Sequence, residues 1–133
     1  MIIIFERQGL KPYEGNHVSL RRADLYLDCR VLLDNTDEDV IQREQGHVLD
    51  LFTELILEAL RHIPERRRDR ALENPYIDPV RICCVCAWGI HRSKAACNIL
   101  VDRFRTDQAL LKRVQKITHR SQISVQHPLG TEI

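Results

Sequence analysis

The possible folds of this chain are limited above all by one short apolar segment, Val80 to Cys86. Arg81 is its single charged residue, and its other side chains are valine, isoleucine or cysteine. Such a segment is typical of a central strand covered on both faces, as in parallel sheets. Small and apolar residues at helical spacing follow it from Ser93 to Arg105. This succession of strand, loop and helix predicts an α/β protein with parallel strands.

The N-terminal half carries both strand and helix signals. β-Branched residues predict a strand over residues 1–5, and alternation of apolar and polar residues predicts a second strand over 24–33. A helical stretch should begin near Glu38, after a turn with capping residues. Apolar residues three and four positions apart predict a helix over 48–63 with one buried stripe, which Pro64 ends.

The C-terminal third has weaker patterns. We expect a short helix over 107–114, a last strand over 114–119 and a loose tail from Ser121. With 133 residues and 44% hydrophobic content, the chain can bury one modest core. The prediction is a single, three-layer-like α/β domain over 1–122 with a tail at 123–133. Its sheet should be mixed, mostly parallel and of four or five strands, with flanking helices and a strand-loop-helix anion-binding loop.

Charge and cysteine content limit the partners and the cellular compartment that we expect for the protein. The net charge of +1 creates no global field toward nucleic acid or a membrane, and no segment is apolar for long enough to be a signal peptide core or a membrane span. The five cysteines are odd in number, and three of them crowd into one strand. We therefore expect reduced thiols in a cytoplasmic protein. A metal site at Cys83, Cys84 and Cys86 would need a second group of ligands, and the chain offers no further CxxC or HxxxH spacing to complete it. We therefore expect neither a metal nor a cofactor.

The segment between the central strand and the following helix is the main candidate site. A helix that starts directly after a strand points its first N–H groups at the loop, where they can hold an anion. Arg92 adds a planar fork for phosphate oxygens, and the hydroxyl of Ser93 can cap or donate. We therefore predict a phosphate pocket. Its residues are Cys86, Ala87, Trp88, Gly89, Ile90, His91, Arg92 and Ser93.

The same segment also has the spacing of a cysteine-dependent phosphatase loop. Cys86 and Arg92 are spaced as CxxxxxR and Ser93 follows, so a thiolate could attack phosphorus while the arginine holds the phosphoryl oxygens. Val85 stands where such enzymes usually carry histidine, and no aspartate lies in an obvious general-acid motif. Cys86 can equally be a buried small residue at the end of a strand. Catalytic and non-catalytic roles both stay open.

Three motifs together resemble the C-terminal domain of the RapZ family, the RNase adapter proteins. That family has a loop of the form C-T-G-G-x-H-R-S, an upstream F-D-x-R-F-L and a terminal H-R. The resemblance covers about residues 1 to 122. The matching residues are Cys86, Gly89, His91, Arg92, Ser93, Asp28, Arg30, His119 and Arg120.

The chain departs from the family pattern in several places. Ala87 and Trp88 replace the threonine and first glycine of the family loop, and the region after the upstream motif is shortened to residues 34–37. None of the five glycines can form the GxxxxGK[ST] loop of the nucleotide-binding domain that precedes this module in full-length members. The resemblance implies binding of a phosphorylated amino sugar or similar anion, a contribution to small-RNA binding, and self-association into a homo-oligomer.

Several further residues have both a functional and a structural interpretation. Asp28 and Arg30 fall on one face of the expected strand, where they can reach the pocket or form a structural salt bridge. His91 can contact a second phosphate oxygen or cap the helix, and Trp88 can stack on a ligand or pack on the protein. Two basic zones can form an RNA-binding face or an ordinary solvated surface. Their residues are Arg66, Arg67, Arg68, Arg113, Lys116 and Arg120.

We therefore expect a module that binds a phosphorylated metabolite or nucleotide-like anion, acting as a sensor or a small-RNA-binding adapter. A cysteine-dependent phosphatase that uses Cys86 and Arg92 is the first alternative. A protein-interaction module with a vestigial pocket is the second. The expected partners are a phosphorylated small molecule and RNA, with no membrane partner.

Overall fold

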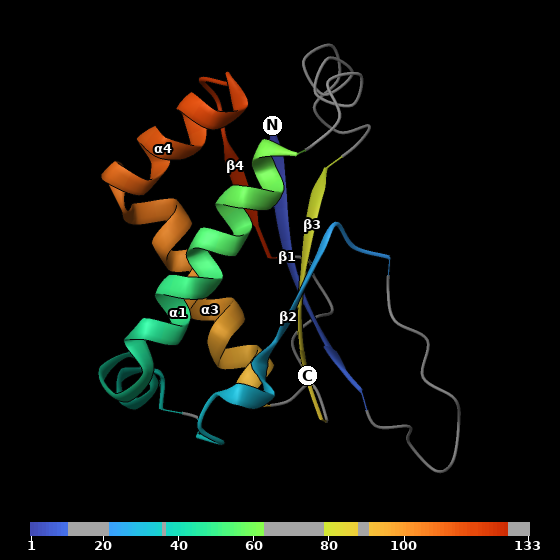
Figure 1. Cartoon of the computed structure of the whole chain (residues 1–133), viewed down its shortest axis with the longest axis vertical. Coiled ribbons are helices and arrows are strands. Elements are labelled where there is room, and N and C mark those ends of the chain that lie inside the picture. Colours follow the sequence, from blue (N-terminus) through green and yellow to red (C-terminus); the bar gives the residue numbers. More distant parts are fainter. Residues whose placement is uncertain (11–21, 36, 63–78, 88–90, 128–133) are drawn as a thin grey trace.

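Four parallel strands in the order β2-β3-β1-β4 form the sheet of the protein (Figure 1). The computed structural model describes residues 1–10, 22–35, 37–62, 79–87 and 91–127. The strands are β1 (Ile2–Gly9), β2 (Leu25–Asp28), β3 (Val80–Cys86) and β4 (Ser124–Gln126). β3 pairs with β1 on one side and with β2 on the other, and β4 extends β1 at the edge. The predicted α/β fold with a parallel sheet is confirmed, and every strand pair in the described part is parallel.

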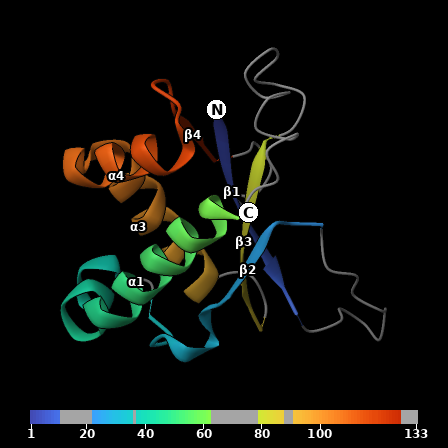
Figure 2. The ribbon, with the colours of Figure 1, turned by 45° about the horizontal axis from the view of Figure 1, so that its top comes forward.

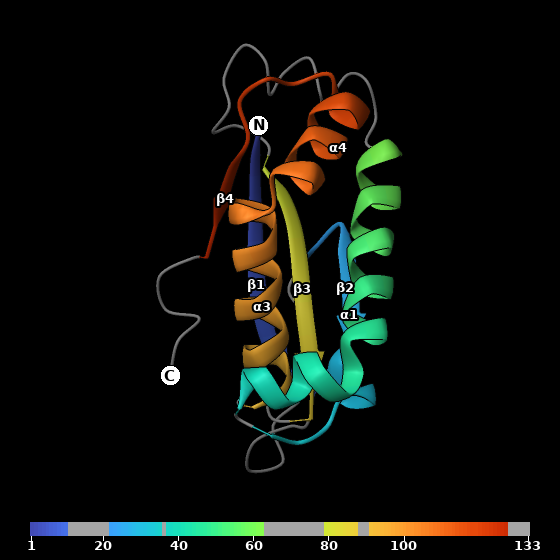
Figure 3. The same cartoon turned by 90° about the vertical axis from the view of Figure 1, so that its left-hand side faces the viewer.

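The helices lie on one face of this sheet (Figures 1 and 3). They are the 3-10 turn η1 (Cys29–Val31) and the helices α1 (Glu38–Arg61), α3 (Arg92–Thr106) and α4 (Gln108–Thr118). The turned view in Figure 2 shows the same separation of sheet and helices. Within the described ranges the domain therefore has two layers, a sheet and a helical layer, rather than the three-layer arrangement that we expected.

The core lies between the helices and the inner face of the sheet. Ile3 and Phe5 of β1 and Ile82 of β3 are fully buried there, as the alternation of side chains along a strand requires. The rings of Phe5 and Phe104 are 5.7 Å apart between centroids and are tilted by 49°, which joins β1 to α3. Each such fully buried side chain stabilises the fold by roughly 1.5–3 kcal/mol.

The helix signals predicted in the N-terminal half are confirmed, with one irregularity. The capping turn and the stripe of apolar residues belong to one element, α1, which begins at Glu38 after the N-cap Asp37. Gln45 has φ −132° and ψ 32°, so the backbone leaves helical geometry at this residue and α1 is kinked. Pro64, the expected end of the helix, lies outside the described residues.

The C-terminal third differs from the prediction. Residues 114–119 are not a strand, because Leu110, Val114 and Thr118 are buried at spacings of four and belong to α4. His119 then ends the helix with φ 56°, in the left-handed region. The last strand is β4, within the segment that we expected to be a tail, so the boundary at residue 122 cuts through the domain. With three residues, β4 is too short to show a period.

The second predicted strand is also shorter than expected. β2 ends at Asp28, because the side chain of Asp28 accepts a hydrogen bond from the N–H of Arg30 and turns the chain into η1. The other edge of the sheet is protected by a side chain. Arg105 of α3 donates from Nε to the carbonyl of Val125 in β4 (2.8 Å), so this backbone acceptor of the edge strand is occupied.

Asp107 joins α3 to α4 and provides a test of this part of the fold. Its N–H donates to the carbonyl of Arg103 (2.9 Å), and its Oδ1 accepts from the N–H of Leu110 (3.1 Å). We expect Asp107→Ala to lower the free energy of unfolding by about 1 kcal/mol in urea denaturation, because the side-chain cap of α4 is lost. Asp107→Asn should retain most of the stability. Asp102→Ala, at an exposed position of α3, is the control, and an equal loss in both alanine variants would contradict the capping role.

Candidate anion-binding site

The candidate loop lies at the carboxyl ends of the strands, where the sheet of an α/β protein presents its ligand sites. β3 ends at Cys86, and α3 begins at Arg92. Ala87 follows β3 and is half-buried, whereas Trp88, Gly89 and Ile90 lie outside the described residues. The strand and the helix on either side of the predicted loop are therefore confirmed. Their junction is at the lower end of the sheet in Figures 1 and 3.

Cys86 and Ser93 meet at the base of this junction. Cys86 is 3% exposed and Ser93 is completely buried. Their Sγ and Oγ atoms are 3.2 Å apart, with the thiol placed to donate to the hydroxyl. The spacing of seven residues therefore brings the end of β3 against the first turn of α3. This contact gives the buried hydroxyl a hydrogen-bond partner, which a buried polar group requires.

The first turn of α3 presents its N–H groups without a cap. His91 occupies the N-cap position, but its side chain makes no capping hydrogen bond, and the first turn contains no acidic residue. The first bond of the helix runs from Ala95 N–H to the carbonyl of His91 (2.9 Å). Among the described residues, the N–H groups of Arg92, Ser93 and Lys94 find no acceptor. An uncapped helix start of this kind favours an anion through its N–H groups and its dipole.

Arg92 turns toward the end of β2. Its Nη1 donates to the carbonyl of Arg30 (3.0 Å), across 62 residues of sequence, and its side chain is only partly buried. A guanidinium has five N–H donors. The bond to Arg30 fixes the side chain at the edge of the sheet and uses one donor, so the remaining donors are available for a ligand.

Asp28 and Arg30 form an ion pair beside Arg92. Arg30 donates from Nε to Oδ1 (2.9 Å) and from Nη2 to Oδ2 (2.7 Å), and its N–H also reaches Oδ1 (3.1 Å). These bonds hold the pKa of Asp28 below its usual value, and the positive charge of Arg92 acts in the same direction. The structural interpretation is confirmed, because the pair is a salt bridge, and a contact with a bound anion stays a prediction. The expectation that both residues share one strand face is wrong, since Arg30 lies in η1.

His91 is held by the segment that follows η1. Its Nδ1 lies 3.2 Å from Oδ1 of Asp34, and both side chains are more than half exposed. His91 therefore does not cap α3 through its side chain, and its ring is anchored to the segment that leads into α1. Asp34 is a contact that sequence reasoning missed, although it lies in the shortened region after the upstream motif.

Sequence reasoning also missed a buried arginine near the site. β1 continues beyond the predicted end at Phe5, and Arg7, which is 5% exposed, lies opposite Cys84 in the register of β1 and β3. The next pair on the same face is Gly9 and Cys86, the residue that opens the loop. The continuation of β1 was missed because residues 6 and 7 are charged, and charged residues are uncommon inside strands.

A group of three thiols lies deeper in the core. Cys84 of β3 forms side-chain hydrogen bonds with Cys29 and Cys97, which together with complete burial hold the pKa of Cys84 well above its usual value. Cys97 also lies 3.3 Å from the Nε2 atom of His127. Among the described residues, no three histidine, cysteine, aspartate or glutamate side chains come together as ligands for a metal ion.

The predicted basic zones are only partly described. Arg66, Arg67 and Arg68 lie outside the described residues. Arg113 forms a two-pronged ion pair with Glu54 of α1 (2.8 and 2.9 Å), which neutralises it locally. Lys116 is exposed on α4, and Arg120 is half-buried. Since α1 supplies acidic partners to this surface, the excess of basic residues in the C-terminal third does not become an equally basic face, and RNA binding stays a prediction.

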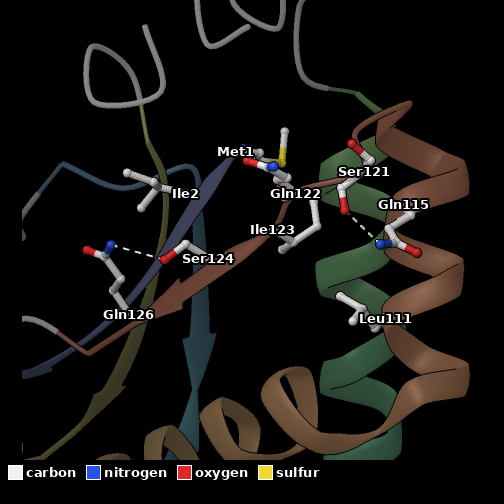
Figure 4. Close-up of a pocket in the computed structure, with 9 residues that line it drawn as sticks. All are labelled: Met1, Ile2, Leu111, Gln115, Ser121, Gln122, Ile123, Ser124 and Gln126. Carbon is white, nitrogen blue, oxygen red and sulfur yellow. Dashed lines mark hydrogen bonds between the residues drawn. The ribbon is translucent and has the colours of Figure 1, made fainter.

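Two hollows of the described surface lie away from the loop. One, of about 450 Å³, lies between the N-terminal residues, α4 and β4 (Figure 4). Its lining is amide, hydroxyl and apolar, as in the pair Gln126 and Ser124 (3.2 Å), and has no charged side chain. The other, of about 580 Å³, lies between α1 and α4 and contains the ion pairs Asp50 to Arg103 and Glu54 to Arg113. Neither hollow includes a residue of the predicted phosphate site.

Comparison with known proteins yields no match to a family model, to a curated protein or to a solved structure. Function must therefore be inferred from the site itself. No helix within the described ranges combines the length and the apolar character needed to cross a membrane.

The burial of the thiols predicts how they react. We expect iodoacetamide at neutral pH to leave Cys29, Cys84 and Cys97 unmodified in the folded protein, because they are fully buried and the raised pKa of Cys84 keeps its thiol protonated. All five cysteines should react once the protein is unfolded in urea. Peptide mass spectrometry after timed labelling measures both states. Labelling of Cys84 at the same rate in both states would show that the core is not closed as described.

Proposed function

We propose that the protein binds a phosphorylated small molecule at the junction of β3 and α3, and that it acts as a metabolite sensor or as a small-RNA-binding adapter. The observation that supports this most strongly is the start of α3. Its N–H groups are uncapped and no acid lies in its first turn, while Arg92 provides a guanidinium in that same turn. Hydrogen-bond donors, helix dipole and positive charge there all favour the same ligand class, an anion with tetrahedral oxygens.

The neighbours of Arg92 narrow the ligand class further. Asp28 carries its negative charge beside two guanidinium groups, and its lowered pKa keeps it ionised at neutral pH. A ligand that places a phosphate on Arg92 therefore meets a carboxylate acceptor close by. Hydroxyl or ammonium groups next to the phosphate can donate to that acceptor, as in a sugar phosphate or an amino-sugar phosphate. The resemblance to the RapZ C-terminal domain supports the same ligand class.

Substitution of Arg92 tests this proposal directly. We expect phosphate, sulfate and amino-sugar phosphates to raise the unfolding temperature of the wild-type protein, because a ligand that binds only the folded state stabilises it. Arg92→Ala should abolish the shift, and Arg92→Lys should retain part of it, since lysine keeps the charge but loses the fork. The measurement is a thermal unfolding titration with each anion.

The matched control for this titration is Arg43→Ala, which removes an exposed arginine of α1 far along the chain from the loop. It should leave every anion-induced shift unchanged, so that a general effect of net charge is excluded. Equal shifts in wild type and Arg92→Ala would refute binding through this arginine. The absence of any shift in the wild-type protein would favour an interaction module with a vestigial pocket.

A cysteine phosphatase is the second candidate, and the contact between Cys86 and Ser93 favours it. In that reaction the thiolate forms a bond to phosphorus, the bond from phosphorus to the leaving oxygen breaks, and water later hydrolyses the phosphocysteine. The hydroxyl of Ser93, 3.2 Å from Sγ, could donate to the thiolate as it leaves. Against this role, Cys86 is 3% exposed and Val85 precedes it.

An aryl phosphate separates the two candidates. We expect p-nitrophenyl phosphate to be hydrolysed no faster with wild-type protein than in buffer, because the nucleophile is buried and no general acid is assigned. Cys86→Ser is the control, and it should keep the thermal shift with sulfate that Arg92→Ala loses. Release of p-nitrophenolate by the wild type that disappears in Cys86→Ser would establish the phosphatase instead.

A further inference from the structure

A residue at the kink of α1, Gln45, holds the segment 30–34, which contains the partners of Arg92 and His91. At Gln45 the helix leaves its regular geometry, and the side chain of this residue bonds to two backbone groups of the preceding segment. Its Oε1 accepts from the N–H of Leu33, and its Nε2 donates to the carbonyl of Val31 (3.1 Å). The side-chain amide thus binds the backbone on both a donor and an acceptor, as a neighbouring strand would.

The segment held in this way is the one that anchors the start of α3. Arg30, next to Val31, offers its carbonyl to Nη1 of Arg92. Asp34, next to Leu33, lies against the ring of His91. Each bond of Gln45 therefore fixes a residue adjacent to one of the two anchors. Four side-chain contacts thus connect α1 to the start of α3 through residues 30–34.

We propose that Gln45 is a positioning residue for the anion site, which acts through residues 30–34 to keep Arg92 and His91 in place. This inference rests on the proposed function of the β3–α3 junction. The break in the helical geometry of α1 lies at the same residue that makes both of these bonds. Without the amide, residues 31–33 lose two bonds, and the carbonyl that orients Arg92 is no longer fixed.

The first test compares Gln45→Ala with Gln42→Ala, an exposed glutamine one turn earlier in α1. Inorganic sulfate is the probe, since it is an anion across the whole pH range used. We expect Gln45→Ala to weaken sulfate binding about three- to tenfold, the range that the loss of one or two ordinary hydrogen bonds gives. Gln42→Ala should bind as the wild type does. Isothermal titration measures the dissociation constants, and circular dichroism checks that both variants are folded.

Gln45→Glu provides a rescue that a merely structural role would not show. At neutral pH its carboxylate can accept from Leu33 but cannot donate to Val31, so sulfate binding should be weakened. A protonated carboxyl group can both accept and donate a hydrogen bond, and an ordinary glutamate has a pKa of about 4.3. The ratio of the variant to the wild-type dissociation constant should therefore fall toward one as the pH is lowered from 7 to 4.5. Use of the ratio removes the effect of other carboxyl groups, which titrate in both proteins.

A measurement without ligand separates this inference from the proposed function. The side-chain N–H protons of Arg92, assigned by their loss in Arg92→Lys, should exchange with water faster in Gln45→Ala than in Gln42→Ala. Unchanged exchange, or equal sulfate affinity of Gln45→Ala and wild type, would overturn the positioning role while leaving anion binding intact. If the wild type binds neither sulfate nor an amino-sugar phosphate, the proposed function fails, and the exchange of the Arg92 protons alone decides whether Gln45 holds this side chain.

Discussion

The pairing of β3 on both of its edges is the constraint on which the other features depend. β3 lies between β1 and β2, and all three run in the same direction. Their carboxyl ends therefore meet at one edge of the sheet, where β3 opens into the loop and β2 turns into η1. A strand in this place must be apolar on both faces, and that requirement accounts for the composition of Val80 to Cys86. It also sets the point at which α3 can start, and so the place of Arg92.

Those parts of the fold whose signals are local could be predicted from the sequence. β3 was predicted from its continuous apolar run, and α1 and α3 were predicted because burial of one helical face leaves a period in the order of residues. β4 could not be predicted, since three residues carry no period and the strand exists only because β1 offers a free edge. The end of α4 was predicted as a strand because a short alternating run also satisfies helical spacing. Burial of Val114 against the core, a tertiary effect, decides between the two.

The same distinction holds for the candidate site. The loop residues were found because they are contiguous, and Asp28 with Arg30 because they form a short motif. The bonds from Arg92 to Arg30 and from His91 to Asp34 span 62 and 57 residues, and no local pattern encodes them. Gln45 was missed for a related reason. Glutamine is an ordinary residue on a helical face, and only its bonds to the backbone of Leu33 and Val31 show that its amide serves another segment.

In the proposed anion site, Asp28 affects which phosphates can bind. A carboxylate between Arg30 and Arg92 neutralises part of their charge while the site is empty, and it holds the Arg30 guanidinium in a fixed plane. A phosphate that approaches Arg30 must then compete with Asp28 for the guanidinium donors of Arg30. This competition lowers the affinity of the proposed site for a bare anion. A ligand that also gives Asp28 a hydroxyl or ammonium donor avoids this competition, because the carboxylate exchanges one partner for another. Under the proposed function, the pair would therefore favour a phosphate that carries neighbouring donors over inorganic phosphate, which is the kind of selectivity that a metabolite sensor needs.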